Sequence, residues 1–127
     1  MPLVKFDVQK GRTAAELKAL LDAEHKILVR DFGVPERDRY QIVTQHEPEE
    51  MIIEDTGFGI ERTERFVMIQ ITMRGGRTEA QKQAFYKDLV AELQATAGTQ
   101  PNDVMVVISE NGSPDWSFGN GEAQFLN

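Results

Sequence analysis

Hydrophobic and polar residues follow two periods along this chain, one typical of strands and one typical of helices. Short apolar or alternating runs predict strands over residues 4–8, 40–44, 66–73 and 104–108. Apolar residues at helical spacing follow the first and third of these runs. The first predicted helix carries Leu17, Leu20, Leu21, Ile27 and Leu28, and the second carries Phe85, Leu89 and Leu93, with Ala84 and Val90 alongside.

Polar residues mark where both helices begin and end. Thr13 with Glu16, and Thr78 with Gln81, have the spacing of a capping box, in which each side chain satisfies a free backbone N–H. Gly33 and Gly98 stand where a C-cap is expected, and Pro35 and Pro101 follow them.

The same order of signals occurs twice. Gly11-Arg12-Thr13 recurs 65 residues later as Gly76-Arg77-Thr78, and Asp38 recurs as Asp103. Strand, helix and strand within about 40 residues form a βαβ unit with parallel strands. We therefore predict one α+β domain over residues 1–127, with repeats at about 2–45 and 66–110. Its four-stranded sheet carries two helices on one face.

This arrangement leaves the second sheet face without a helix to cover it. Residues 104–108 are apolar at every position, which is typical of a strand buried on both faces. Because no third helix is predicted, we expect a closed homo-oligomer with the bare sheet faces inside.

Two segments lie outside the repeats. Residues 46–65 are rich in Glu and Gly and predict a connecting loop, with a short strand at Met51-Ile52-Ile53 and a turn at residues 56–59. The tail, residues 111–127, is rich in Gly, which favours fraying, but it contains Trp116, Phe118 and Phe125. We expect these aromatic residues to dock the tail.

Composition narrows the possible functions. The 127 residues include no Cys, which excludes disulfides and a Cys nucleophile, and the net charge is −7 without any Lys/Arg run, so no nucleic-acid partner is expected. No apolar run approaches the roughly 18 residues that would span a bilayer, so no membrane partner is expected either. With no export signal, the predicted location is the cytoplasm.

The second residue is a proline, Pro2. A small residue at this position normally permits removal of Met1, which would expose a secondary amine able to act as base, nucleophile or acid. On the dipeptide alone, an ordinary second residue is the simpler interpretation. Pro2 begins the first predicted strand, however, and a rigid position favours catalysis.

Asp38 precedes the second predicted strand. If this strand neighbours the first, Asp38 approaches Pro2, where a carboxylate would favour the protonated amine or hold a water. Asp103 occupies the same place in the second repeat, and an Asp before a strand often makes local Asx hydrogen bonds, so a structural role is the alternative.

Two arginines, Arg74 and Arg77, follow the third strand and flank two glycines. Two guanidinium groups near a helix N-terminus are suited to binding a carboxylate. Arg77 repeats Arg12, which favours a turn role, whereas Arg74 corresponds to Gln9 and is the stronger candidate.

The remaining candidates are weak. His25 is expected at the solvated edge of the first helix, and His25 and His46 lack the spacing of a metal pair, so no metal is predicted. Gly57-Phe58-Gly59 lacks the third glycine of a dinucleotide-binding motif. No cofactor is expected.

Taken together, these residues resemble the tautomerase superfamily, and within it the malonate semialdehyde decarboxylases. The resemblance runs nearly end to end. Its most specific stretches are residues 32–35, 38–41, 43–46, 53–57 and 115–119. It implies two βαβ units per chain, a trimer, and an amino-terminal proline at each site.

The resemblance also implies roles for individual residues. Pro2 and Asp38 would be catalytic, Arg74 would bind the substrate carboxylate, and Trp116, Phe118 and Phe125 would form an apolar wall. The decarboxylases have one residue between their two arginines, whereas Gly75 and Gly76 both intervene here, so aligning Arg77 needs a one-residue insertion.

The predicted activity is decarboxylation of a small 3-oxo acid without a cofactor. Keto–enol tautomerisation of a 2-oxo acid, with Pro2 as general base, is the alternative, and hydration of an activated acid is a third possibility. A non-catalytic oligomer that binds a ligand belongs to a different class, and retained Met1 would favour it.

Overall fold

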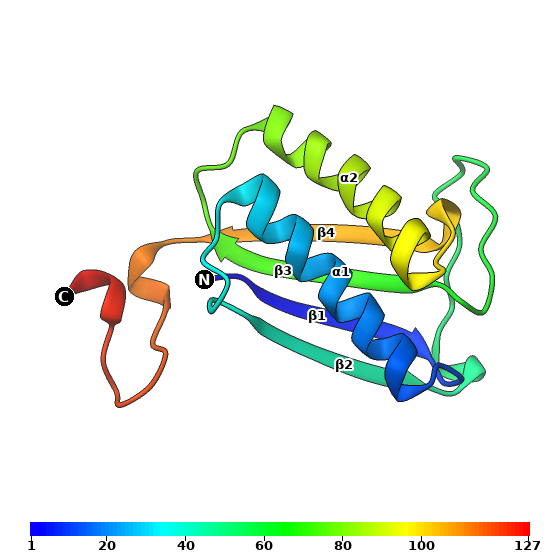
Figure 1. The fold of residues 1–127 in the computed structure, drawn as a ribbon, viewed down its shortest axis with the longest axis horizontal. Helices are drawn as coiled ribbons and strands as arrows, with labels where there is room; N and C mark the ends of the chain where they lie inside the picture. Colours follow the sequence, from blue (N-terminus) through cyan, green and yellow to red (C-terminus); the bar gives the residue numbers. More distant parts are fainter.

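The computed structural model describes residues 1–127 and contains the predicted repeat. Strand β1 (Leu3–Gln9), helix α1 (Ala14–Phe32) and strand β2 (Tyr40–His46) form the first unit. Strand β3 (Val67–Arg74), helix α2 (Glu79–Ala97) and strand β4 (Val104–Asn111) form the second. Both helices lie on one face of a single four-stranded sheet (Figure 1), as the sequence predicted.

The strand order, β2-β1-β3-β4, determines where the functional side chains can meet. β1 pairs in parallel with β2 and antiparallel with β3, while β3 pairs in parallel with β4. The starts of β1 and β2 therefore lie at the same end of the sheet as the ends of β3 and β4. Both chain termini lie at this end of the molecule (Figure 1).

The two helices begin and end at equivalent residues, 65 positions apart. Both capping boxes are present, because Thr13 and Thr78 accept from the backbone N–H three residues later. Gly33 and Gly98 end the helices with φ of 68° and 64°, a left-handed conformation that glycine adopts at little cost.

The core lies between the helices and the sheet. Alternate residues of β1 and β3 point toward the helices and are almost fully buried, among them Phe6, Ile69 and Ile71. Leu20, Ile27 and Leu28 from α1 and Phe85, Leu89 and Leu93 from α2 close the other side. Leu17 and Leu21 are half-buried against this core.

The opposite face of the sheet is open in the single chain. Ile42 is 53% exposed and Val107 is 42% exposed, and Tyr40 and Met105 are also exposed on this face. Val104, Val106 and Ile108 pack against the core, so β4 is covered on one face only. Burial of both its faces requires a partner and remains a prediction.

Two local expectations are wrong. Met51, Ile52 and Ile53 form no strand, because they follow the 3₁₀ turn Pro48–Glu50 in irregular backbone with no neighbouring strand to pair with. His25 is not solvated but 8% exposed, because the loop before β2 folds over it.

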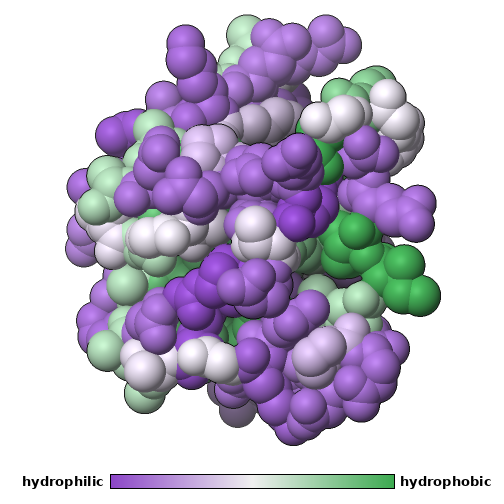
Figure 2. All heavy atoms as spheres, turned by 90° about the vertical axis from the view of Figure 1, so that its right-hand side faces the viewer, coloured by the Kyte–Doolittle hydropathy of each residue, from purple (hydrophilic) through white to green (hydrophobic).

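The predicted turn at residues 56–59 is present, with Asp55 accepting hydrogen bonds from the N–H groups of Gly57 and Ile60. The connecting loop lies at the end of the molecule away from the termini (Figure 1). That end is mostly hydrophilic, with one apolar patch at its side (Figure 2). No helix has both the length and the apolar character that a membrane span requires.

Candidate active site

The candidate site lies at the end of the sheet where β1 and β2 begin and β3 ends. Pro2 is buried directly before β1, Asp38 lies two residues before β2, and Arg74 is the last residue of β3. Leu3 pairs with both Tyr40 and Thr72. Pro2, Asp38 and Arg74 therefore lie at the ends of adjacent strands.

The amino terminus is held between opposite charges. The Met1 amine forms an ion pair with Asp38, and the Nε–H of Arg74 donates to the Met1 Sδ at 3.0 Å. Asp38 favours the charged amine, whereas burial, the largest influence, and the positive charges of Arg74 and Arg77 disfavour it. The net effect lowers the pKa of the Met1 amine from 8.0 to about 6.

Arg74 has only neutral hydrogen-bonding partners. Besides the Met1 sulfur, its Nη1 donates to the Ser113 hydroxyl at 3.1 Å. The ring of Phe125 lies 3.8 Å from its guanidinium carbon. Since neither partner neutralises its charge, Arg74 remains able to pair with an anionic ligand.

Arg77 is bound differently. Its Nη2 donates to the Phe32 carbonyl at 3.2 Å and its Nη1 to the Arg74 carbonyl at 3.4 Å. Its counterpart Arg12 likewise donates to a backbone carbonyl, that of Arg65. Arg77 therefore influences the amino terminus through its charge while its hydrogen bonds hold the end of α1.

The two corresponding aspartates have different surroundings. Asp103 is 1% exposed and accepts from the Thr63 N–H at 2.8 Å and the Thr63 hydroxyl at 2.6 Å, a purely structural arrangement. Asp38 faces the terminal amine instead. Of the pair, only Asp38 lies where chemistry at the terminus can use it.

The tail docks beside this end of the sheet through its aromatic residues. Trp116 stacks on Phe118 with 5.6 Å between ring centroids, and Phe118 meets Phe125 edge-on at 5.1 Å. The Trp116 Nε1–H donates to the Asn111 Oδ1 at 2.7 Å, which anchors the tail to the end of β4. The three rings therefore form a continuous apolar wall.

A hollow of about 290 Å³ opens beside this wall, and its lining combines predicted and unforeseen residues. The lining residues are Pro35, Arg37, Asp38, Tyr40, Phe118 and Phe125. A larger hollow of about 510 Å³ between α1 and the loop before β2 contains none of the predicted site residues. We place the site at the smaller hollow because the terminal amine and Arg74 lie next to it.

Four neighbours of the site were not predicted from the sequence. Pro35 and Arg37 line the hollow, Tyr40 stacks on Phe118 at 5.7 Å, and Ser113 binds Arg74. Tyr40 lies on the sheet face that no helix covers. The only sequence signal for its role was an aromatic residue at the start of a predicted strand. Nothing in the local sequence distinguishes Ser113 from an ordinary turn residue.

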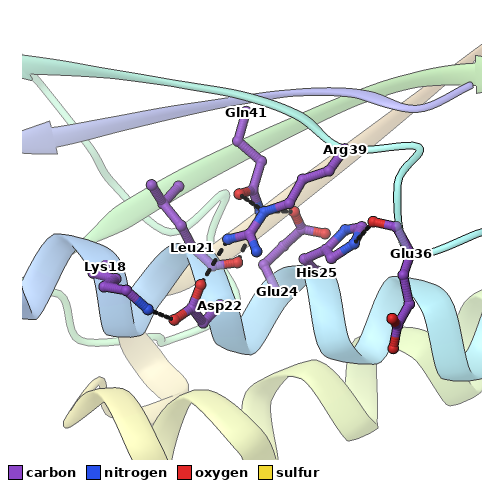
Figure 3. A network of polar contacts seen from close by, with 8 residues as sticks. All are labelled: Lys18, Leu21, Asp22, Glu24, His25, Glu36, Arg39 and Gln41. Carbon is purple, nitrogen blue, oxygen red and sulfur yellow. Dashed lines mark hydrogen bonds and ion pairs between the residues drawn. The ribbon is translucent and has the colours of Figure 1, made fainter.

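The structure gathers no group of three or more His, Asp or Glu side chains able to hold a metal. His46 pairs with Asp7 at 2.7 Å at the far end of the sheet, and the Nε2–H of His25 donates to the Glu36 carbonyl (Figure 3).

A paired βαβ fold with a buried proline, an acid and an arginine at the amino terminus defines a recognisable class. One family model described as a tautomerase enzyme matches residues 38–119, and another so described matches residues 2–60. The chain belongs to the tautomerase family.

Individual relatives agree. The probable tautomerase YrdN of Bacillus subtilis (strain 168) is 48% identical over 99% of this chain and 97% of its own length. A malonate semialdehyde decarboxylase, solved in wild-type, mutant and inactivated forms, is 50% identical with a TM-score of 0.94, covering 98% of this chain and 95% of that one. A malonate semialdehyde decarboxylase inhibited by 3-bromopropiolate is 37% identical with a TM-score of 0.93, covering 98% and 94%.

Proposed function

We propose that the chain, after losing Met1, is a cofactor-independent decarboxylase of a small 3-oxo acid similar to malonate semialdehyde. The observation that carries this proposal is the convergence of Asp38 and Arg74 on the amino terminus. The 50% identity to a malonate semialdehyde decarboxylase supports it.

Removal of Met1 would both expose the Pro2 nitrogen and free the space beside it. Met1 now contacts Asp38 through its amine and Arg74 through its sulfur. A substrate carboxylate placed where the sulfur lies would pair with Arg74. The carbonyl of the same substrate would then face Pro2 and Asp38.

The chemistry requires an acceptor for the electron pair left by carbon dioxide. As the bond between the carboxylate and the α-carbon breaks, the pair moves into the neighbouring carbonyl and forms an enolate, which takes a proton at carbon to give the aldehyde. A protonated Pro2 would stabilise the enolate oxygen by a charge-assisted hydrogen bond.

Pro2 can alternatively act covalently. The free secondary amine adds to the aldehyde, water leaves, and the resulting iminium accepts the electron pair during loss of carbon dioxide. Protonation at carbon and hydrolysis by water then release the product and the amine. Asp38 would orient the amine or the water in this route.

Tautomerisation of a 2-oxo acid is the second candidate, and one observation favours it. The positive charges of Arg74 and Arg77, which disfavour the protonated amine at Met1, would also disfavour a protonated Pro2, and a general base must be unprotonated. Hydration of an activated acid, with Asp38 holding the water, uses the same residues.

We also propose that the chain assembles as a homotrimer. The exposed Ile42, Met105 and Val107 lie on the sheet face that no helix covers. These apolar side chains lie on both outer strands of the same face, β2 and β4, and exposed apolar side chains on a sheet face are typical of an interface between subunits.

Three measurements test the proposed function. Intact mass spectrometry of the purified protein determines whether Met1 is absent. Carbon dioxide release from malonate semialdehyde, compared with ketonisation of a 2-oxo acid enol, identifies the reaction. The R74A variant should lose at least about 100-fold in kcat/KM, the size expected for loss of a positioned charged donor. The P2A variant keeps a terminal amine but loses the secondary amine and its rigid ring, and its kcat/KM should also fall.

The pH–rate profile separates the candidates. Activity that requires protonated Pro2 supports the enolate route. Activity that requires the free amine fits both tautomerisation and the iminium route, and release of carbon dioxide then distinguishes these two. Retained Met1 together with no turnover of either substrate would contradict an enzymatic role and favour the non-catalytic oligomer.

A further inference from the structure

Helix α1 carries a carboxylate inside the apolar core. Glu24 is 0% exposed, and burying a carboxylate among apolar side chains is costly unless it is paired and hydrogen-bonded. Its counterpart in the second repeat, 65 residues later, is Leu89, also 0% exposed. The fold therefore accepts leucine at this position, and a structural requirement of the βαβ unit does not explain Glu24.

Glu24 faces the first residues of strand β2 (Figure 3). Its Oε1 accepts from the Gln41 Nε2 at 2.9 Å, and the same amide group donates to the Leu21 carbonyl at 2.8 Å. The second carboxylate oxygen, Oε2, is buried without a partner. Glu24 thus fixes the Gln41 side chain in one orientation, at the cost of an unsatisfied oxygen.

The network continues to the residue next to Asp38. The oriented Gln41 presents its Oε1 to the Nε–H of Arg39 at 2.7 Å, and the Arg39 Nη2 donates to Asp22 at 2.7 Å. On the other side of Asp38, the Glu36 carbonyl accepts from His25 at 2.8 Å (Figure 3). Asp38 therefore stands between two backbone positions that are both tied to α1.

The second repeat lacks this network. The counterparts of Gln41 and Arg39 are Val106 and Val104, which are apolar and pack against the core. The loop that leads to Asp103 is held by Asp103 itself, through Thr63. Asp38 cannot be held in that way, because its carboxylate is engaged with the terminal amine.

We infer that Glu24 is a positioning residue for Asp38, acting through Gln41 and Arg39 to fix the loop that presents the Asp38 carboxylate to the amino terminus. This inference rests on the proposed function, in which that carboxylate orients Pro2 or its water. A displacement of about 1 Å at a reacting group can cost on the order of 100-fold in rate, which gives such a network a use.

The charge of Glu24 is part of this arrangement. Burial, the main cause, raises the pKa of its carboxyl to about 7, while the Gln41 hydrogen bond and the Arg39 charge oppose that shift. The buried core residues that β1, β3 and α2 contribute are apolar, so Arg39 is the cation that responds when Glu24 ionises. The ionised form attracts Arg39 and tightens the loop.

Two variants test the inference in the mature full-length protein. E24Q keeps the shape and a hydrogen-bond acceptor for Gln41 but cannot ionise. The double variant E24L/Q41V installs the residues of the second repeat and should fold with an unchanged or higher Tm. E92Q is the matched control, because it removes a helix carboxylate that pairs with Lys26 at 2.7 Å.

We expect kcat to fall roughly tenfold in E24L/Q41V, with KM changing much less, because a misplaced catalytic group affects the reacting geometry. In E24Q the kcat–pH profile should differ from that of the wild type, because the contribution of the Glu24 carboxyl is lost while that of the Pro2 amine stays. E92Q should behave as the wild type. Equal kcat, KM and pH profiles in all four proteins would overturn the inference.

A second readout does not require turnover. A titration followed by ¹⁵N NMR of labelled Pro2 reports the pKa of its amine, which depends on how closely Asp38 approaches. A changed Pro2 pKa in E24L/Q41V supports the inference even if neither substrate reacts, in which case only the proposed function fails. An unchanged pKa together with unchanged kinetics contradicts the inference while leaving the proposed function intact.

Discussion

The guanidinium of Arg74 lies over the ring of Phe125, with 3.8 Å between its central carbon and the ring centroid. This contact joins the end of β3 to the last turn of the tail, Gln124–Leu126. It holds the cation beside the amino terminus without neutralising its charge.

Replacing Phe125 with Leu should weaken substrate binding more than it weakens chemistry. A partly buried cation–π contact is worth about 1–2 kcal/mol, so F125L should raise KM for a carboxylate substrate roughly tenfold and change kcat less. Steady-state kinetics measure both constants. F58L is the control, because Phe58 is 78% exposed in the distant loop and its replacement should leave both unchanged. A larger fall in kcat than rise in KM would contradict this role for the ring.

Asp38 and Asp103 should respond differently to the same substitution. D38N removes the negative charge beside the terminus, so the pKa of the Pro2 amine should fall and the pH–rate profile should shift to lower pH. D103N replaces one of the two oxygens of buried Asp103 that accept from Thr63 with an NH₂ group, and it should lower stability by about 1–3 kcal/mol with kcat and the profile unchanged. Thermal unfolding and kinetics distinguish the two, and an unshifted profile in D38N would count against its proximity to Pro2.

Blocking the amino terminus should abolish activity without unfolding the protein. A chain extended by Gly-Ser before Met1 keeps the Pro2 nitrogen in a peptide bond, so it can serve neither as acid nor as nucleophile. We expect no measurable turnover and a Tm close to that of the mature protein. A cleavable extension, removed by a protease to leave Pro2 first, provides the control and should restore the rate.

The buried Glu24 should make the protein less stable as the pH rises. The pKa of its carboxyl is about 7 when folded, compared with an ordinary 4.5, so the folded state binds the proton more tightly than the unfolded chain does. Integrated between pH 4.5 and 7, this difference lowers the free energy of unfolding by about 3 kcal/mol. Denaturant titrations at several pH values should show this decline in the wild type, with the decline absent in E24Q. Parallel curves for the two proteins would show that the carboxyl is not perturbed.

A charge on the open sheet face should prevent assembly. V107D places a carboxylate near Met105 on the outer strand β4, on the face without helices, where desolvating it would be costly in an interface. Size-exclusion chromatography with light scattering should give a trimer for the wild type and a monomer for V107D. The control A95D places the same charge on the exposed side of α2 and should stay trimeric.

Most of the fold was predictable because its signals are local. Capping boxes, C-cap glycines and alternating apolar residues each determine the structure of a few neighbouring residues, and the repeat confirms them twice. The strand order was not predictable, because β1 pairs with β3 across 57 intervening residues and nothing local encodes that pairing. His25 was misplaced for a similar reason, since its burial depends on a loop rather than on the helix pattern.

The candidate site was predictable where comparison of the two repeats distinguishes functional residues from structural ones. Arg74 differs from its counterpart Gln9, whereas Arg77 matches Arg12, and the structure places both Arg12 and Arg77 on backbone carbonyls. Comparison of Asp38 with Asp103 left their roles open, because the deciding contact is with the amino terminus. Glu24 gave no sign of its burial, since a glutamate within a helix is usually solvated.

The antiparallel pairing of β1 with β3 gives the molecule an approximate two-fold symmetry, and this symmetry cannot extend to the chemistry. At the opposite end of the sheet, the equivalents of Pro2, Asp38 and Arg74 are Val67, Asp103 and Gln9. Val67 follows Phe66 through a peptide bond, so its nitrogen cannot become an amine. A continuous polypeptide has one amino end, and duplicating the βαβ unit within it leaves room for a single reactive terminus. An amine-directed reagent that depends on this site should therefore label one equivalent per chain, whatever the number of subunits.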